Sequence, residues 1–184
     1  SAQMKLWHLF ATMAMLAALS IVLVWLIHFP IFPAAPYLEY DPADIPILIG
    51  TFAFGPVAGL VITVIAAVIQ GLTVSAGSGF YGIIMHVIAT GTFVTVAGSI
   101  YNRKKTRGSA AIGLACGVLA MTVIMVAANL IVTPLFLGMP VSAVKSLIIP
   151  FIIPFNLIKA GVNGVVTFVL YKAVSRFIKS ENQV

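Results

Sequence analysis

Charged residues are scarce in this sequence, and their scarcity excludes most classes of soluble protein. Only 8% of the 184 residues are charged and 61% are hydrophobic, with a mean hydropathy of +1.16. Soluble domains hold roughly 45–50% apolar residues. At about 20 apolar residues per spanning helix, the length allows five or six spans and no folded domain outside the bilayer. We therefore expect an all-α integral membrane protein that forms a single domain over residues 1–184.

Cysteine and the common catalytic signatures are nearly absent too. The one cysteine, Cys116, lies in an apolar segment, so a disulfide, zinc or redox site has no second residue, and we expect it to be a small buried residue. There is no GxxxxGK[ST] phosphate loop, HExxH metal motif or GxSxG nucleophile motif. We therefore expect no enzyme, no metal or cofactor, and no ATP hydrolysis by this chain alone.

Proline, glycine and charge divide the apolar runs into six predicted spans. The first run is too long for a signal-peptide core and ends at Pro30. The apolar run 45–74 is too long for one span, and Gly55-Pro56 divides it, because proline suits the first turn of a helix. Pro134 is expected to end the fifth span, and the sixth to begin at Pro154. The predicted spans are about 6–29, 44–54, 56–74, 80–101, 109–132 and 154–178, with an extended outer loop after the first.

The distribution of charge favours six spans over five. Basic residues concentrate on the cytoplasmic side of membrane proteins. Six spans place both termini there, together with Lys5, the cluster 103–107, Lys172, Arg176 and Lys179. The loop 31–43, which we expect to be aqueous, then faces outward with Glu39, Asp41 and the adjacent Asp44. Because the basic residues form small groups at span ends rather than a stripe, no nucleic-acid partner is expected.

Six polar residues inside the apolar spans suggest a pocket. They are Gln70, His86, Asn129, Asn156, Lys159 and Asn163. Such side chains are costly in a bilayer and usually face a partner or a cavity. The first five belong to four helices at one depth in the outer half, so we expect a pocket that opens outward, with the loop Tyr37–Asp41 available as a lid. Asn156 and Lys159 are three positions apart and share a helix face.

Other interpretations of these polar residues stay open. The side chains can bond neighbouring helices, or in the case of Lys159 extend to the membrane interface. These plainer interpretations weigh most for Gln70 and His86. Pairs of small residues four positions apart, Ala14/Ala18, Gly55/Gly59 and Gly113/Gly117, are most simply explained by helix packing within the chain.

Three motifs give the chain a family resemblance. They are Pro36-Tyr37-Leu38-Glu39-Tyr40-Asp41 leading to Asp44-Ile45-Pro46, then Phe52-Ala53-Phe54-Gly55-Pro56-Val57-Ala58-Gly59, and Pro154-Phe155-Asn156-Leu157-Ile158-Lys159-Ala160-Gly161-Val162-Asn163. Over nearly its whole length the chain resembles the substrate-binding S components of energy-coupling factor (ECF) vitamin transporters, most of all the riboflavin-specific ones.

The resemblance implies a fold, a ligand and partners. It implies six helices with an outer pocket, in which Asn129, Asn156 and Lys159 would bond the polar edge of the flavin ring. Tyr37 and Leu38 would close over the ligand. Riboflavin would be the transported ligand. Ala14 and Ala18 would dock the ECF transmembrane coupling subunit, which works with two ATP-binding-cassette ATPases in the bacterial plasma membrane.

Alternative functions remain at this point. An S component for FMN, pantothenate or folate is the nearest, although the two carboxylates of folate would require more cationic charge than Lys159 supplies. A small intramembrane enzyme is disfavoured because no nucleophile–base or metal constellation occurs at one depth. A structural membrane subunit without a ligand is the third.

Overall fold

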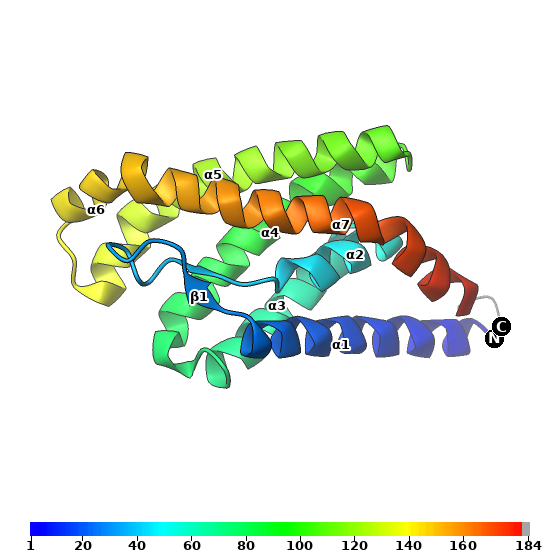
Figure 1. The fold of residues 1–184 in the computed structure, drawn as a ribbon. Coiled ribbons are helices and arrows are strands. Elements are labelled where there is room, and N and C mark those ends of the chain that lie inside the picture. The colour runs from blue at the N-terminus through cyan, green and yellow to red at the C-terminus, as the bar shows by residue number, and fades with distance from the viewer. Residues whose placement is uncertain (182–184) are drawn as a thin grey trace.

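The structure, a computed structural model, describes residues 1–181 as a bundle of helices with one short pair of strands (Figure 1). The elements are α1 (Ala2–Leu26), β1 (Phe29–Pro30), β2 (Glu39–Tyr40), α2 (Asp44–Phe54), α3 (Pro56–Leu72), the 3₁₀ turn η1 (Ala76–Ser78), α4 (Gly79–Arg103), α5 (Arg107–Leu137), α6 (Val141–Leu147), the π turn η2 (Ile148–Ile152) and α7 (Ile153–Glu181). β1 and β2 pair antiparallel.

The described helices have the length and composition of membrane spans. Four helical stretches, 2–26, 76–103, 107–137 and 141–174, are long and apolar enough to cross a bilayer, whereas α2 and α3 are shorter apolar helices. Large apolar side chains are exposed along the outside of the bundle, including Val57, Val123, Leu135 and Val165. An apolar outer surface of this kind suits lipid rather than water as the solvent.

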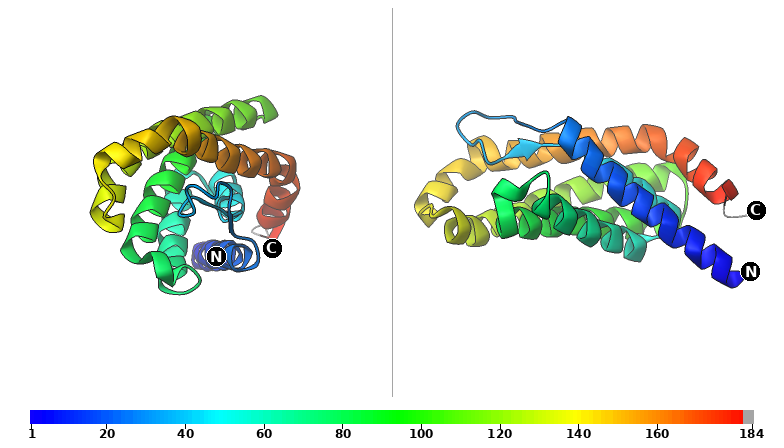
Figure 2. Two further views of the ribbon diagram at one scale, coloured as in Figure 1. Left: turned by 60° about the vertical axis from the view of Figure 1, so that its left-hand side comes forward. Right: turned by 90° about the horizontal axis from the view of Figure 1, so that it is seen from below.

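The short helix α2 forms the centre of the bundle. It packs against α1, α3, α4 and α7, while α4 also packs along α3 and α5, and α5 along α7 (Figure 2). Nine of its eleven residues are buried. The predicted division of the run 45–74 is confirmed, since Gly55 at φ 99° ends α2 and Pro56 starts α3. Glycine adopts this positive φ without the steric cost of a side chain.

Helical structure near two prolines extends further than predicted. Helix α5 continues through Pro134 to Leu137 and ends at Gly138 in the left-handed conformation. Helix α7 begins at Ile153, close to the predicted start of the sixth span, but the short helix α6 and the π turn η2 precede it where no helix was predicted. A proline lacks an N–H and its ring clashes with the carbonyl four residues earlier. The wider π turn accommodates Pro150, and Pro154 lies in the first turn of α7, where a proline is tolerated.

Small residues separate into buried and exposed pairs. A Cβ at Gly113 would lie 2.9 Å from the Ala97 carbonyl oxygen, and one at Gly117 would lie 2.7 Å from the Phe93 ring. These glycines therefore let α5 approach α4, which is packing within the chain. Ala14 and Ala18 are instead exposed on α1. Cys116 is also exposed, so its predicted burial is wrong: it lies on the outer apolar face of α5.

The two ends of the bundle differ in composition. The start of α1, the α4–α5 turn and the end of α7 lie at one end, and β1, β2, η1 and α6 at the other (Figure 1). Rings of Phe52, Tyr101 and Tyr171 fill the interior toward the first end, with centroids 4.6–5.7 Å apart. This aromatic cluster closes the bundle there. The predicted basic residue Lys179 lies outside the side chains that the structure describes.

Candidate functional site

A cavity of about 140 Å³ lies where the loop between α1 and α2 meets α3, α4, α5 and α7. Its apolar and aromatic wall is made by Leu38, Ala67, Tyr81, Met85, Ala89, Met121, Met125 and Phe155. Its polar lining includes Tyr37, Glu39, Asp41, Asp44, Gln70, Ser75, Ser78, His86, Thr90, Asn129, Asn156 and Lys159. A cavity that combines an apolar and aromatic wall with convergent polar groups is typical of small-molecule sites.

The seven residues expected at a pocket all line this cavity. They are Tyr37, Leu38, Gln70, His86, Asn129, Asn156 and Lys159. The loop contributes the first two, α3 and α4 one each, α5 one and α7 the last two. The docking candidates Ala14 and Ala18 lie elsewhere, on the exposed face of α1.

The acidic end of the loop is buried, which corrects the expectation of an aqueous segment. Asp41 and Asp44 are 8% and 1% exposed, whereas Glu39 is exposed. Lys159 Nζ lies 3.2 Å from Asp41 Oδ2 and 3.5 Å from the Glu39 carbonyl oxygen. The ammonium compensates the buried carboxylate of Asp41, which would otherwise be costly. The three acidic residues within six positions were visible in the sequence. Their burial was not, because the ion pair joins residues 118 positions apart.

Asn163 fixes the same segment of the loop to α7. The Tyr40 hydroxyl donates to Asn163 Oδ1 at 2.9 Å, and Asn163 Nδ2 donates to the Asp41 carbonyl oxygen at 3.0 Å. Asn163 is fully buried. Burial, and next the charge of Asp41, raise the pKa of Tyr40 above its usual range, so its hydroxyl stays protonated as a donor. Sequence reasoning noted Asn163 as an intramembrane polar residue but assigned it no partner.

Helix α4 holds the carboxylate of Asp44. The Thr90 hydroxyl donates to Asp44 Oδ1 at 2.6 Å, and His86 Nε2 lies 3.7 Å from the same oxygen. The second oxygen, Oδ2, is buried without a hydrogen-bond partner. His86 was predicted from the sequence, whereas Asp44 and Thr90 were not, because an acidic residue next to a polar loop resembles an exposed helix start.

The two asparagines of the cavity bond within their own helices. Asn129 Nδ2 donates to the Met125 carbonyl oxygen at 2.8 Å, and its Oδ1 accepts from the Thr133 hydroxyl at 3.0 Å. Asn156 Nδ2 donates to the Ile152 carbonyl oxygen at 2.8 Å. These bonds position the amides at the cavity wall. Each amide still has a second N–H with which to bond another group.

Two more buried polar atoms of the cavity residues have no hydrogen-bond partner. They are the Tyr37 hydroxyl and Gln70 Oε1, although Gln70 Nε2 donates to Ser75 Oγ at 3.2 Å. Burial, and next the proximity of Tyr81, raise the pKa of Tyr37 to about 12, so the phenol is neutral at physiological pH. Buried polar atoms are normally bonded, so unpartnered ones around a cavity indicate a ligand site.

Known proteins resemble this chain over its length. The sequence model of the family "ECF transporter, substrate-specific component" matches residues 8–171. The riboflavin transporter RibU of Staphylococcus aureus is 34% identical over 91% of this chain and 90% of its own. The riboflavin transporter FmnP of Bacillus subtilis is 30% identical over 91% of this chain and 92% of its own.

A solved structure agrees with the sequence matches. It is described as the S component of a bacterial ECF transporter, and it superposes with a TM-score of 0.80 at 33% identity, over 97% of this chain and 99% of the other. The chain therefore belongs to the substrate-specific components of ECF transporters, a family of transporter subunits rather than of enzymes.

Proposed function

We propose that this chain is the riboflavin-binding S component of an ECF-type importer, with riboflavin as its transported ligand. The observation that carries the proposal is the cavity, in which seven side chains from five segments meet around an apolar wall. Tyr37 and Gln70 bring unpartnered polar atoms to it. The relatives named as riboflavin transporters support this choice of ligand.

The chemistry of the cavity suits an isoalloxazine ring. The flat ring system needs an apolar wall, which Met121, Met125 and Phe155 provide together with a polarizable surface. The pyrimidine edge carries donors and acceptors, and the amides of Asn129 and Asn156 can serve both kinds of group. These residues, with Lys159, are proposed to bond that edge.

The charge of the cavity favours a neutral ligand. Among the residues described at the cavity, Lys159 is the one lysine or arginine, and Asp41 already neutralises it at 3.2 Å. A phosphate or a pair of carboxylates would require further cationic charge. Riboflavin therefore suits the site better than its phosphate FMN or folate.

The loop between α1 and α2 is the proposed lid. Tyr37 and Leu38 line the cavity from this loop, while its end is bonded to α7. The cavity volume of about 140 Å³ is below the roughly 300–1,000 Å³ of pockets for drug-sized ligands. The cavity must therefore widen to hold riboflavin, and the loop is the segment proposed to move outward and then close over the ring.

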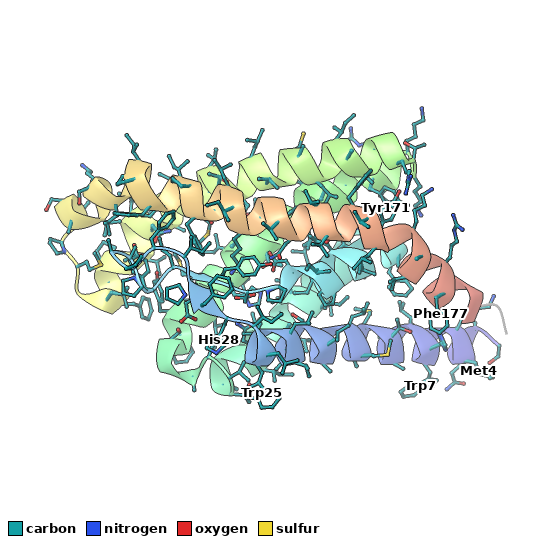
Figure 3. All side chains as sticks on the ribbon, in the orientation of Figure 1. Met4, Trp7, Trp25, His28, Tyr171 and Phe177 are labelled. Carbon is teal, nitrogen blue, oxygen red and sulfur yellow. The ribbon has the colours of Figure 1, made fainter. Side chains whose placement is uncertain are left out.

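We propose six membrane crossings in one domain, with the cavity on the outer side and both termini in the cytoplasm. Trp7 and Trp25 point away from the bundle near the two ends of α1 (Figure 3). They are 18 positions apart, about 27 Å along a helix, which approaches the roughly 30 Å of the hydrocarbon core. Tryptophans commonly lie at both membrane interfaces. The short helices α2 and α3 account for the second and third crossings.

The energy for transport is proposed to come from partner proteins. Ala14 and Ala18 are exposed on α1 and offer a small-residue surface for the ECF transmembrane coupling subunit, which would act with two ATP-binding-cassette ATPases in a bacterial plasma membrane. The sequence contains no phosphate loop of its own. The purified chain in liposomes should thus bind riboflavin without concentrating it, and ATP-independent accumulation would contradict this mechanism.

Titration of riboflavin into the detergent-purified chain tests the ligand and the site together. Flavin fluorescence should be quenched at stoichiometric concentrations, because aromatic and polar walls enclose the ring. Lys159→Ala and Asn156→Ala should weaken binding, whereas Thr63→Val, a buried change in α3 away from the cavity, should not. Absence of quenching by the wild-type chain would overturn the choice of ligand, and a screen of FMN, folate and pantothenate would follow.

A further inference from the structure

The carboxylate of Asp44 is held by one oxygen only. Thr90 Oγ1 donates to Oδ1 at 2.6 Å, and His86 Nε2 lies 3.7 Å from that atom. Asp44 lines the cavity and is 1% exposed, yet its Oδ2 has no hydrogen-bond partner. An acceptor on a buried carboxylate is normally satisfied, because leaving it unpaired is costly.

We propose that Asp44 is a ligand-binding residue whose Oδ2 accepts a hydrogen bond from the transported molecule. Thr90 and His86 position the carboxylate, since both lie next to its Oδ1. The inference rests on the proposed function and adds a contact to the same site. It assigns the ligand a donor, either a ring N–H or a hydroxyl group, opposite the carboxylate.

Gln70 Oε1 is another unpartnered acceptor, but among the described carboxylates of the cavity Asp44 is the one with a buried, unpartnered oxygen. The ammonium of Lys159 can only donate, and it lies on Asp41 at 3.2 Å rather than on Asp44. Asn129 Oδ1 already accepts from Thr133. An ionised carboxylate can only accept, and its hydrogen bonds are about twice as strong as neutral ones. A flavin with a ribityl chain presents one ring N–H and several hydroxyls, so it can supply the donor.

The test compares the wild-type chain with Asp44→Asn, which keeps the shape and removes the charge. Each is titrated with riboflavin, with N3-methylriboflavin, which lacks the ring N–H, and with lumiflavin, which lacks the ribityl hydroxyls. Asp44→Asn should weaken riboflavin binding about 10- to 100-fold, the effect expected of a hydrogen bond to a charged group. With the analogue that lacks the contacted donor, the two proteins should bind equally.

Either of two results would overturn the inference. One is an Asp44→Asn chain that binds riboflavin as the wild type does. The other is an equal loss of affinity for all three flavins, which indicates that Asp44 only supports the shape of the site. Failure of the wild-type chain to bind riboflavin would instead refute the proposed function, and this inference with it.

Two threonine variants complete the experiment. Thr90→Val removes the hydroxyl that orients Asp44. It should weaken riboflavin binding by a smaller factor than Asp44→Asn does, and this loss should disappear with the same analogue. Thr63→Val removes a buried hydroxyl that bonds the Gly59 carbonyl oxygen in its own helix, so it should bind all three flavins normally. If Asp44→Asn does not fold, Thr90→Val carries the same comparison, and a loss independent of the analogue would again refute the role.

Discussion

The bonds of Asn163 to the loop predict how long riboflavin stays bound. Asn163→Ala removes both the hydrogen bond from the Tyr40 hydroxyl and the one to the Asp41 carbonyl oxygen. A neutral hydrogen bond contributes about 1 kcal/mol net, so the closed loop should lose about 2 kcal/mol relative to the open one. Riboflavin would have to pass this proposed lid to leave, so release should accelerate roughly 25-fold, at about 1.4 kcal/mol per factor of ten.

Tyr40→Phe separates the two bonds. It removes the hydroxyl that donates to Asn163 and leaves the bond from Asn163 to Asp41 in place. The expected loss of about 1 kcal/mol corresponds to a roughly fivefold faster release. The two variants should therefore form an ordered series below the wild type.

The assay is the recovery of flavin fluorescence after rapid dilution of the riboflavin-loaded protein. Thr63→Val is the control for a buried polar substitution away from the loop and should release riboflavin at the wild-type rate. An unchanged release rate in Asn163→Ala would refute the proposed closure by this loop. Equal rates in Tyr40→Phe and Asn163→Ala would show that the bond to Asp41 contributes nothing.

Three further predictions concern the ion pair, the helix packing and the loop tyrosine. Lys159→Met and Asp41→Asn should each weaken riboflavin binding. The double variant should lose less binding free energy than the two single losses added together, with a coupling of about 0.5–3 kcal/mol. Strictly additive losses would contradict a direct ion pair. Gly113→Val should cost about 1–3 kcal/mol and lower the melting temperature, because its side chain would meet a backbone carbonyl oxygen of α4; an unchanged melting temperature would contradict that contact. Burial raises the pKa of Tyr37 from 10.0 to about 12, so unfolding releases its proton in that window and thermal stability should fall as pH rises through it. The thermal stability of Tyr37→Phe should fall less steeply over this pH range. Identical stability profiles for the variant and the wild type would contradict the raised pKa.

The helices were largely predictable because proline, glycine and charge interrupt the apolar runs. Gly55-Pro56 marked the boundary between α2 and α3 correctly. The failures also involve prolines. Proline disfavours a regular helix, but sequence does not reveal whether a π turn will absorb it, as η2 does around Pro150, or whether the helix simply continues, as at Pro134.

The cavity was predictable to the extent that a membrane penalises polar side chains. This penalty identified Gln70 and Asn129 as residues of one pocket from their depth alone. The acidic residues were misjudged for the opposite reason, since carboxylates near a loop are usually solvated. Their burial depends on partners distant in sequence, Lys159 for Asp41 and Thr90 for Asp44, which only the packed helices bring together.

Native mass spectrometry of the detergent-solubilised wild-type chain with riboflavin tests the central claim most directly, because it counts the ligands on each chain. We expect one riboflavin per chain at near-stoichiometric concentration, and loss of this bound ligand in Lys159→Ala. A chain that carries no riboflavin, or a ladder of adducts that grows with concentration and is unchanged in Lys159→Ala, would contradict a single riboflavin site in this cavity.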